Sequence, residues 1–222
     1  MNTSTETAND KNTASPSSVD RILEVAEALF AQRGFSAVSM NAIAEQAKVS
    51  KANIFHHFSS KEDLYLAVMR TACDATTGKA IAQTEKTSGL VSEALAQFSK
   101  DGLRGLLNRD QFPRLILREL LDSQSTHAKD LAEKAFGESF AGFIALIREW
   151  QAQGRVRSDI DPAVVAVMLH SSNVIYSMSR EILRHLPDVS FADQSDAFSQ
   201  KMVDVLLRGI EVTAPQSEGS SF

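Results

Sequence analysis

The feature that most constrains the fold is a pair of short helical segments that follow one another almost directly. Ser39 precedes the first segment and Ser50 precedes the second, and a serine in that place accepts a hydrogen bond from an early helix N–H group. Only Lys48 and Val49 stand between the first segment and the capping Ser50, so the turn is tight. Helices of about two turns joined in this way cannot pack antiparallel and must cross steeply, as in a helix-turn-helix. We therefore predict helices over residues 40–47 and 51–57.

The rest of the chain also shows helical periodicity. Apolar residues recur three and four positions apart from Ile22 onward, and Gly34 ends the first of these stripes. Ser59 with Glu62, or Ser60 with Asp63, forms a capping box that opens a fourth helix of about 20 residues. Ten glycines and five prolines are few for 222 residues, which favours helices. We predict an all-α fold of about nine helices, with an N-terminal three-helix domain and a larger helical domain.

Length and composition bound the organisation of the chain. A chain of 222 residues forms one large or two small domains, and its net charge of −5 restricts any nucleic-acid contact to a local surface. Cys73 has no partner for an intrachain disulfide, and the first residues lack the pattern of a signal peptide, so we expect a cytoplasmic protein. The uncharged residues 163–179 are too short and too polar for a membrane span. The predicted division is a disordered arm over 1–18, a helix-turn-helix domain over 19–64, a regulatory domain over 65–212 and a flexible tail over 213–222.

A resemblance to a known family covers residues 20–70. The segment SMNAIAEQAKVSKANIFHHFSSKEDL, together with RILEVAEALFAQRGFSAVSM before it, resembles the DNA-binding region of the tetracycline-repressor (TetR) family. The resemblance implies a homodimeric, ligand-responsive transcription factor, usually a repressor, that binds a palindromic operator. Two positions depart from the family pattern: Lys48 stands where the turn residue is usually Gly, and Phe55 stands where Tyr usually contacts a phosphate. We expect Lys48 to adopt a left-handed conformation, at a cost of roughly 1 kcal/mol.

The second short helix supplies candidate contacts to DNA. Its first residues are Lys51, Ala52 and Asn53. In the major groove Lys can donate to guanine, Ala can contact the thymine methyl group and Asn can pair bidentately with adenine. Between residues 39 and 61 the net charge is +2, whereas the remainder carries −7, so a mildly basic patch lies on an acidic protein. The full set of predicted DNA-binding residues is Ser39, Asn41, Lys48, Ser50, Lys51, Ala52, Asn53, Phe55, His56, His57 and Lys61. Of these, Ser39, Asn41, His57 and Lys61 are expected at phosphates, with His56 able to replace the missing tyrosine hydroxyl.

Other classes of function find less support. His56 and His57 are adjacent and point about 100° apart on a helix, so they cannot chelate a metal as histidines four residues apart do. We found no Gly-rich phosphate loop, GxSxG, HExxH or paired cysteines, and we predict no enzyme activity, no metal and no cofactor. Glu119 and Asp122 near Arg118 fit surface ion pairing. The rival hypothesis is a helical scaffold or partner-binding protein whose helix-turn-helix is only structural.

The helix expected over residues 162–186 places polar side chains beside an apolar stripe. Such a helix suits a ligand cavity next to a subunit interface, although hydrogen bonding of the polar stripe within the core explains it equally well. The predicted pocket residues are Phe112, Arg118, Phe140, Phe143, His170, Asn173, Tyr176 and Arg180. The expected guest is a small, mainly apolar inducer with one anionic or polar head.

We also expect the last two long helices to form the homodimer interface. The apolar candidates there are Met168, Ile175, Met202, Leu206 and Ile210. The fourth helix is expected to couple ligand to DNA as one rigid rod.

Overall fold

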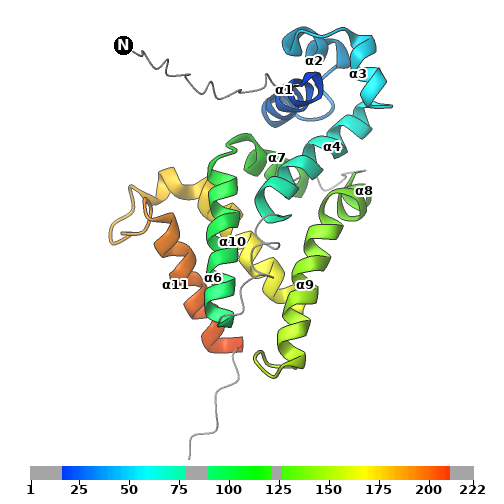
Figure 1. The fold of residues 1–222 in the computed structure, drawn as a ribbon. Coiled ribbons are helices and arrows are strands. Elements are labelled where there is room, and N and C mark those ends of the chain that lie inside the picture. The colour runs from blue at the N-terminus through cyan, green and yellow to red at the C-terminus, as the bar shows by residue number, and fades with distance from the viewer. Residues whose placement is uncertain (1–16, 79–89, 122–126, 211–222) are drawn as a thin grey trace, which may run out of the picture.

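The computed structural model describes residues 17–78, 90–121 and 127–210. Within these ranges every regular element is a helix, which confirms the predicted all-α fold (Figure 1). The predicted tail lies outside the described residues, as do residues 1–16 of the predicted arm. Residues 17 and 18 do not belong to an arm, because Ser17 caps the first helix in a capping box with Asp20.

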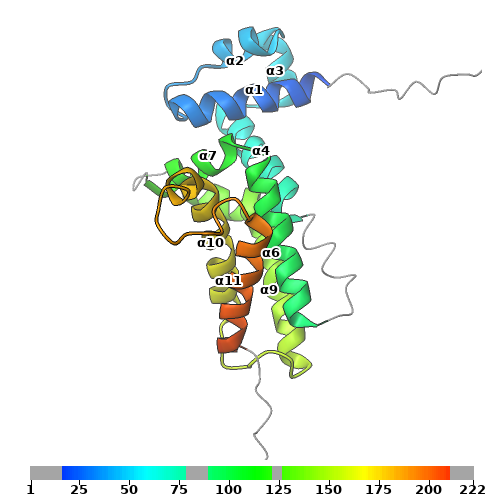
Figure 2. The same cartoon turned by 90° about the vertical axis from the view of Figure 1, so that its left-hand side faces the viewer.

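The first three helices gather at one end of the molecule (Figures 1 and 2). They are α1 (Ser18–Arg33), α2 (Met40–Ala47) and α3 (Lys51–His57). Ser39 accepts from the amide of Ala42, and Ser50 accepts from the amide of Asn53, so both predicted caps are present. These local bonds fix where α2 and α3 begin, and the two-residue turn then sets their steep crossing.

The connection to the rest of the protein is α4 (Lys61–Cys73), capped by Ser60. The α-helical hydrogen bonding stops at Cys73 and the chain continues as a π-helical turn, η1 (Asp74–Gly78). The predicted fourth helix of about 20 residues thus runs helically from Lys61 to Gly78 with a change of hydrogen bonding after Cys73, and the rest of its predicted length lies outside the described residues. The Thr76 hydroxyl bonds to the carbonyl oxygens of Ala72 and Cys73 at 3.1 and 2.9 Å, which offers these carbonyls a partner other than the regular helix ladder.

The larger part of the protein is a bundle that extends away from α1–α3 (Figure 2). Its long helices are α6 (Val91–Leu107), α9 (Gly137–Ala152), α10 (Pro162–Leu183) and α11 (Ser195–Ile210). Shorter elements lie at the junction with the first domain: α7 (Gln111–Leu121), α8 (Ala128–Leu131) and the π-turn η2 (Ala132–Phe136). No described helix is long and apolar enough to cross a membrane.

Two hydrophobic clusters form the core. One joins α1–α4 to α7, α8 and η2, and the other joins α6, α9, α10 and α11. The predicted domain border between residues 64 and 65 falls inside α4, and Leu64 and Tyr65 pack in the same cluster. The helix-turn-helix therefore shares its core with the regulatory helices, so a movement of those helices reaches α1 and α4 directly.

Candidate functional site

The turn between α2 and α3 has the predicted left-handed residue. Lys48 has φ 55° and ψ 46°, and its amide donates to the carbonyls of Ala44 and Glu45. A β-carbon in this conformation is unfavourable, so the turn holds a modest strain that glycine would relieve. The Lys48 side chain is exposed, and it lies only three residues before the start of α3. An exposed cation beside a recognition helix can contact a DNA phosphate.

The start of α3 presents the predicted base-contacting residues unequally. Lys51 and Ala52 are exposed, whereas Asn53 is half-buried and its Oδ1 atom is buried with no hydrogen-bond partner among the described residues. A bidentate contact with adenine uses both the oxygen and the nitrogen of an amide. The predicted bidentate role of Asn53 thus requires its side chain to turn outward.

The end of α3 carries an exposed group of rings. Phe55 is 45% exposed, and the Lys51 ammonium lies 5.8 Å from the centre of its ring. His56 and His57 are also exposed, with their rings 4.9 Å apart. Asn41 on α2 is exposed as well, so polar and aromatic groups from both helices are open to a phosphate backbone.

Lys61 is placed differently from the prediction. Its ammonium donates to the carbonyls of Phe35 and Val38 at 3.0 and 3.1 Å, and it lies 4.1 Å from the centre of the Phe35 ring. These contacts close the loop between α1 and α2. The positive charge is used inside the domain, which makes Lys61 a structural residue in this conformation and disfavours the predicted phosphate contact.

A second set of contacts ties α7 to the first domain. The Arg118 guanidinium donates to the carbonyls of Ala31 and Gln32 at 2.9 and 2.8 Å, at the end of α1. Beside it, the Tyr65 hydroxyl on α4 donates to the Glu119 carboxylate at 2.5 Å. The last carbonyls of a helix have no partner within the helix, so Arg118 satisfies two groups that otherwise need water.

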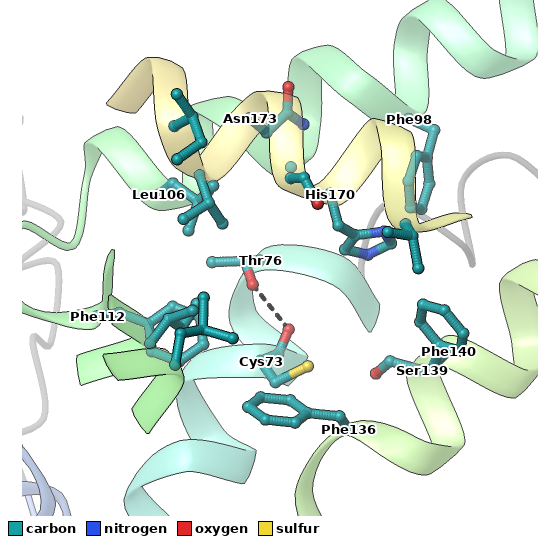
Figure 3. A pocket seen from close by; sticks show the side chains of 17 residues that line it. Cys73, Thr76, Phe98, Leu106, Phe112, Phe136, Ser139, Phe140, His170 and Asn173 are labelled. Atoms are coloured by element: carbon teal, nitrogen blue, oxygen red, sulfur yellow. Dashed lines mark hydrogen bonds between the residues drawn. The ribbon is translucent and has the colours of Figure 1, made fainter. Parts of the chain in front are cut away.

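The regulatory bundle contains a cavity of about 450 Å³ that is partly open to solvent (Figure 3). Side chains from α4 and η1, α6, α7, η2 and α9, and α10 line it, and none of the lining residues carries a formal charge. Phe112, Phe140, His170 and Asn173, all predicted pocket residues, belong to this lining. The size and the apolar character match those of small-molecule sites in proteins.

Comparisons with known proteins agree with this geometry. Residues 22–68 match the family model described as "Bacterial regulatory proteins, tetR family". The transcriptional regulator RutR of Escherichia coli K12 is 31% identical over 158 residues, which span 70% of this chain and 72% of RutR. This chain belongs to the TetR family.

Other TetR-family relatives extend the comparison over most of the chain. The transcriptional repressor KstR2 of Mycolicibacterium smegmatis is 26% identical over 66% of this chain and 71% of its own length. The structure of KstR2 from Mycobacterium tuberculosis superposes with a TM-score of 0.61 at 18% identity, covering 90% of this chain and 98% of that one. FadR of Bacillus halodurans gives a TM-score of 0.67 at 16% identity over 86% and 97%. At such identities the two structures support the fold alone.

As a TetR-family member, the protein is a ligand-responsive, DNA-binding transcriptional regulator. The rival hypothesis of a helical scaffold with a purely structural helix-turn-helix is not favoured. The segments RILEVAEALFAQRGFSAVSM, IAEQAKVS, IFHHF and SSKEDL carried the resemblance to this family, and all but Arg21 lie within the matched residues.

Four of the predicted pocket residues lie outside the cavity of this TetR-family protein. Arg118 holds the end of α1, and Phe143 is buried in the second core cluster, 4.4 Å from the Phe98 ring. The Tyr176 hydroxyl donates to the carbonyls of Phe191 and Ala192 at 2.9 and 2.8 Å, and burial raises its pKa. Arg180 pairs with Asp193 at 3.0 Å. Long-range partners that the sequence does not reveal thus decide these positions.

Conversely, the cavity has lining residues that the prediction missed. Cys73, Thr76 and Ser139 face it, at the point where α4, η1 and α9 approach one another (Figure 3). Each of these residues occurs singly in an ordinary helical pattern, so no sequence signal marked it. Cys73 is buried, which makes the only cysteine of the chain a reporter for access to the cavity.

The α10 helix exposes apolar side chains that a monomer leaves in water. Met168 is 49% exposed and Ile175, which also lines the open side of the cavity, is 61% exposed; their place in an interface stays a prediction. Leu206 is only 8% exposed and packs in the second core cluster of its own chain, which disfavours its predicted place at an interface. Met202 is partly buried, and the side chain of Ile210 lies outside the described residues.

Proposed function

We propose that this regulator is a homodimeric repressor that binds a palindromic operator and leaves it when a small, mainly apolar ligand fills the cavity. The observation that carries the proposal is that α7 belongs to both sites. Phe112 and Ile116 line the cavity, and Arg118 on the same helix bonds to the end of α1. A guest that displaces α7 therefore moves the helix-turn-helix without any intervening element.

In this proposal α3 enters the major groove with Lys51 and Ala52 at base edges. Asn53 joins them after its amide turns outward. Exposed groups on and before α2 and α3 contact the phosphates. They are Ser39, Asn41, Lys48, Ser50, Phe55 through the edge of its ring, His56 and His57. Lys61 supports them indirectly by fixing the loop before α2.

The dimer is proposed to form through α10 and α11. Exposed apolar residues on α10 and α11 are Val164, Val167, Met168, Ile175, Ile182 and Val205. An obligate interface of this kind buries about 2,000 Å² or more, a range that a face of two long helices can supply. The two α3 helices must then be spaced by about 34 Å or a multiple of it to reach successive major grooves.

We infer a cytoplasmic protein without enzyme activity, since its relatives are regulators of transcription. The division into a DNA-binding part over residues 19–64 and a regulatory part over 65–212 is retained as a functional division. It does not coincide with a gap in packing, because α4 belongs to both parts.

Selection from a random duplex library tests the proposal. We expect the full-length protein to enrich a palindrome, and the Lys51→Ala variant to bind it more weakly while relaxing one position of each half-site, at about 1–3 kcal/mol for a lost base contact. Lys129→Ala on α8 removes an equal charge far from α3 and serves as the control. Enrichment of an asymmetric site, or equal affinity of the two variants, contradicts the docking.

A further inference from the structure

His170 of α10 presents to the cavity a ring nitrogen whose hydrogen bonding is incomplete. Its Nδ1 atom lies 2.8 Å from the carbonyl oxygen of Ala166, one helical turn earlier. A carbonyl only accepts hydrogen bonds, so Nδ1 carries the proton of this contact. In the neutral ring, Nε2 is then left with its lone pair and acts as an acceptor.

The surroundings of His170 keep its ring uncharged. The rings of Phe98, Phe140 and Phe143 lie 5.7, 6.0 and 6.1 Å from it, so aromatic surfaces replace much of its water. Burial lowers the pKa of His170 below its ordinary value, against a smaller opposite effect of the Ala166 carbonyl. None of the residues that line the cavity is acidic, so no carboxylate there stabilises an imidazolium.

Two other polar side chains of the lining already have partners, whereas the Ser139 and Ser171 hydroxyls, which can donate as well as accept, have none among the described residues. The Asn173 amide accepts from the Ser99 hydroxyl at 3.2 Å and donates to the Ser99 carbonyl at 3.1 Å. The Thr76 hydroxyl donates to the carbonyls of Ala72 and Cys73 at the end of α4. In the described part of the chain, Nε2 of His170 has no hydrogen-bonding partner, and the ring projects from α10 toward Ser139 and Phe140 across the cavity (Figure 3).

We propose that the ligand is an uncharged, largely apolar molecule with one hydroxyl or N–H group, which donates a hydrogen bond to Nε2 of His170. The inference rests on the proposed function and deepens it. It also replaces the anionic head considered from the sequence. Arg118 and Arg180, the cations that would have held such a head, bond elsewhere. A charge moved from water into a lining without counter-charge pays a desolvation cost that no contact there returns.

Four matched probes test the donor directly: 4-tert-octylphenol, its methyl ether, tert-octylbenzene and 4-tert-octylbenzoate. All four share the same apolar tert-octylphenyl body. The phenol adds a hydrogen-bond donor, the ether adds only an acceptor, tert-octylbenzene adds no polar group, and the benzoate adds an anion. In calorimetric titrations of the full-length protein at pH 7.5, we expect the phenol to bind about 3- to 10-fold more tightly than the ether. We expect the benzoate to bind most weakly.

The variant His170→Leu removes the acceptor and keeps an apolar surface. We expect the advantage of the phenol over the ether to fall below about 2-fold, with tert-octylbenzene bound as in the parent protein, which also shows that the cavity is intact. His185→Leu, an exposed position just beyond the end of the same helix, is the control and should keep the advantage.

The outcomes separate the two levels of the argument. A phenol that gains nothing over the ether, an advantage that survives in His170→Leu, or a benzoate that binds most tightly overturns the inference while the cavity remains a ligand site. If none of the four probes binds, the proposed ligand function of the cavity fails, and the inference fails with it.

Discussion

Replacing Arg118 with alanine should loosen the hold of the regulatory bundle on the helix-turn-helix. The change removes the bonds to the carbonyls of Ala31 and Gln32, at 2.9 and 2.8 Å. Bonds to a charged donor contribute about 1.5–3 kcal/mol when buried, but Arg118 is exposed and solvent screens it. We therefore take about 1 kcal/mol for the partly buried bond to Ala31 and about 0.5 kcal/mol for the exposed one. The favourable position of a cation at the end of α1 adds about 0.3 kcal/mol.

The sum is about 2 kcal/mol, which for a chain of this size lowers the melting temperature by about 4–8 °C. Arg114→Ala is the matched control, because Arg114 lies one turn earlier on α7, is exposed and has no hydrogen bond or ion pair with the described residues. Calorimetry of both variants measures the difference, and hydrogen exchange at residues 31–34 locates it. Equal melting temperatures, or unchanged exchange at the end of α1, would refute the reasoning and remove the coupling through α7.

Four further outcomes follow from local geometry. Lys48→Gly should stabilise the protein by about 0.5–1 kcal/mol in urea unfolding, since relief of about 1–2 kcal/mol exceeds the added chain entropy, whereas Lys48→Ala should gain nothing. Gly105→Ala should destabilise the protein by about 1–3 kcal/mol, because the new β-carbon would lie 2.9 Å from the backbone of Thr76. Gly102→Ala on the same helix is the control and should not destabilise the protein, because its β-carbon would meet only a side-chain atom at 3.4 Å. Burial lowers the pKa of His170 in the folded protein, so between this lowered pKa and the ordinary one the unfolded chain binds more protons than the folded protein. The free energy of unfolding should therefore fall as pH drops below about 6.5, and the His170→Leu variant should show a smaller fall. A maleimide should label buried Cys73 slowly, and bound tert-octylphenol should slow it further; labelling that the phenol leaves unchanged would contradict access through the cavity.

The sequence allowed the helix-turn-helix to be predicted almost to the residue because its determinants are local. Ser39 and Ser50 bond to amides three residues away, and the conformation of Lys48 follows from a turn of two residues. Such contacts depend on neighbours in the chain, so the pattern alone specifies them.

The candidate sites could be predicted only in part, because long polar side chains choose partners far away in the sequence. Lys61 bonds to carbonyls 23 and 26 positions earlier, and Arg118 to carbonyls 86 and 87 positions earlier. Helical periodicity tells which face such a residue occupies but not what stands opposite. The π-turn after Cys73 was not predicted for a related reason, since an apolar stripe in the sequence does not reveal the hydrogen-bonding pattern of the backbone.

Because the lining of the cavity carries no formal charge, the affinity for a ligand and the affinity for DNA should respond differently to ionic strength. Binding to DNA releases condensed counterions and weakens steeply as salt rises, roughly in proportion to the number of phosphates neutralised. A neutral guest in a lining without formal charges releases none, so its affinity should stay nearly constant over the same range. A rise in intracellular potassium would thus lower the occupancy of DNA by this regulator, while the concentration of a neutral ligand needed to fill the cavity would stay the same.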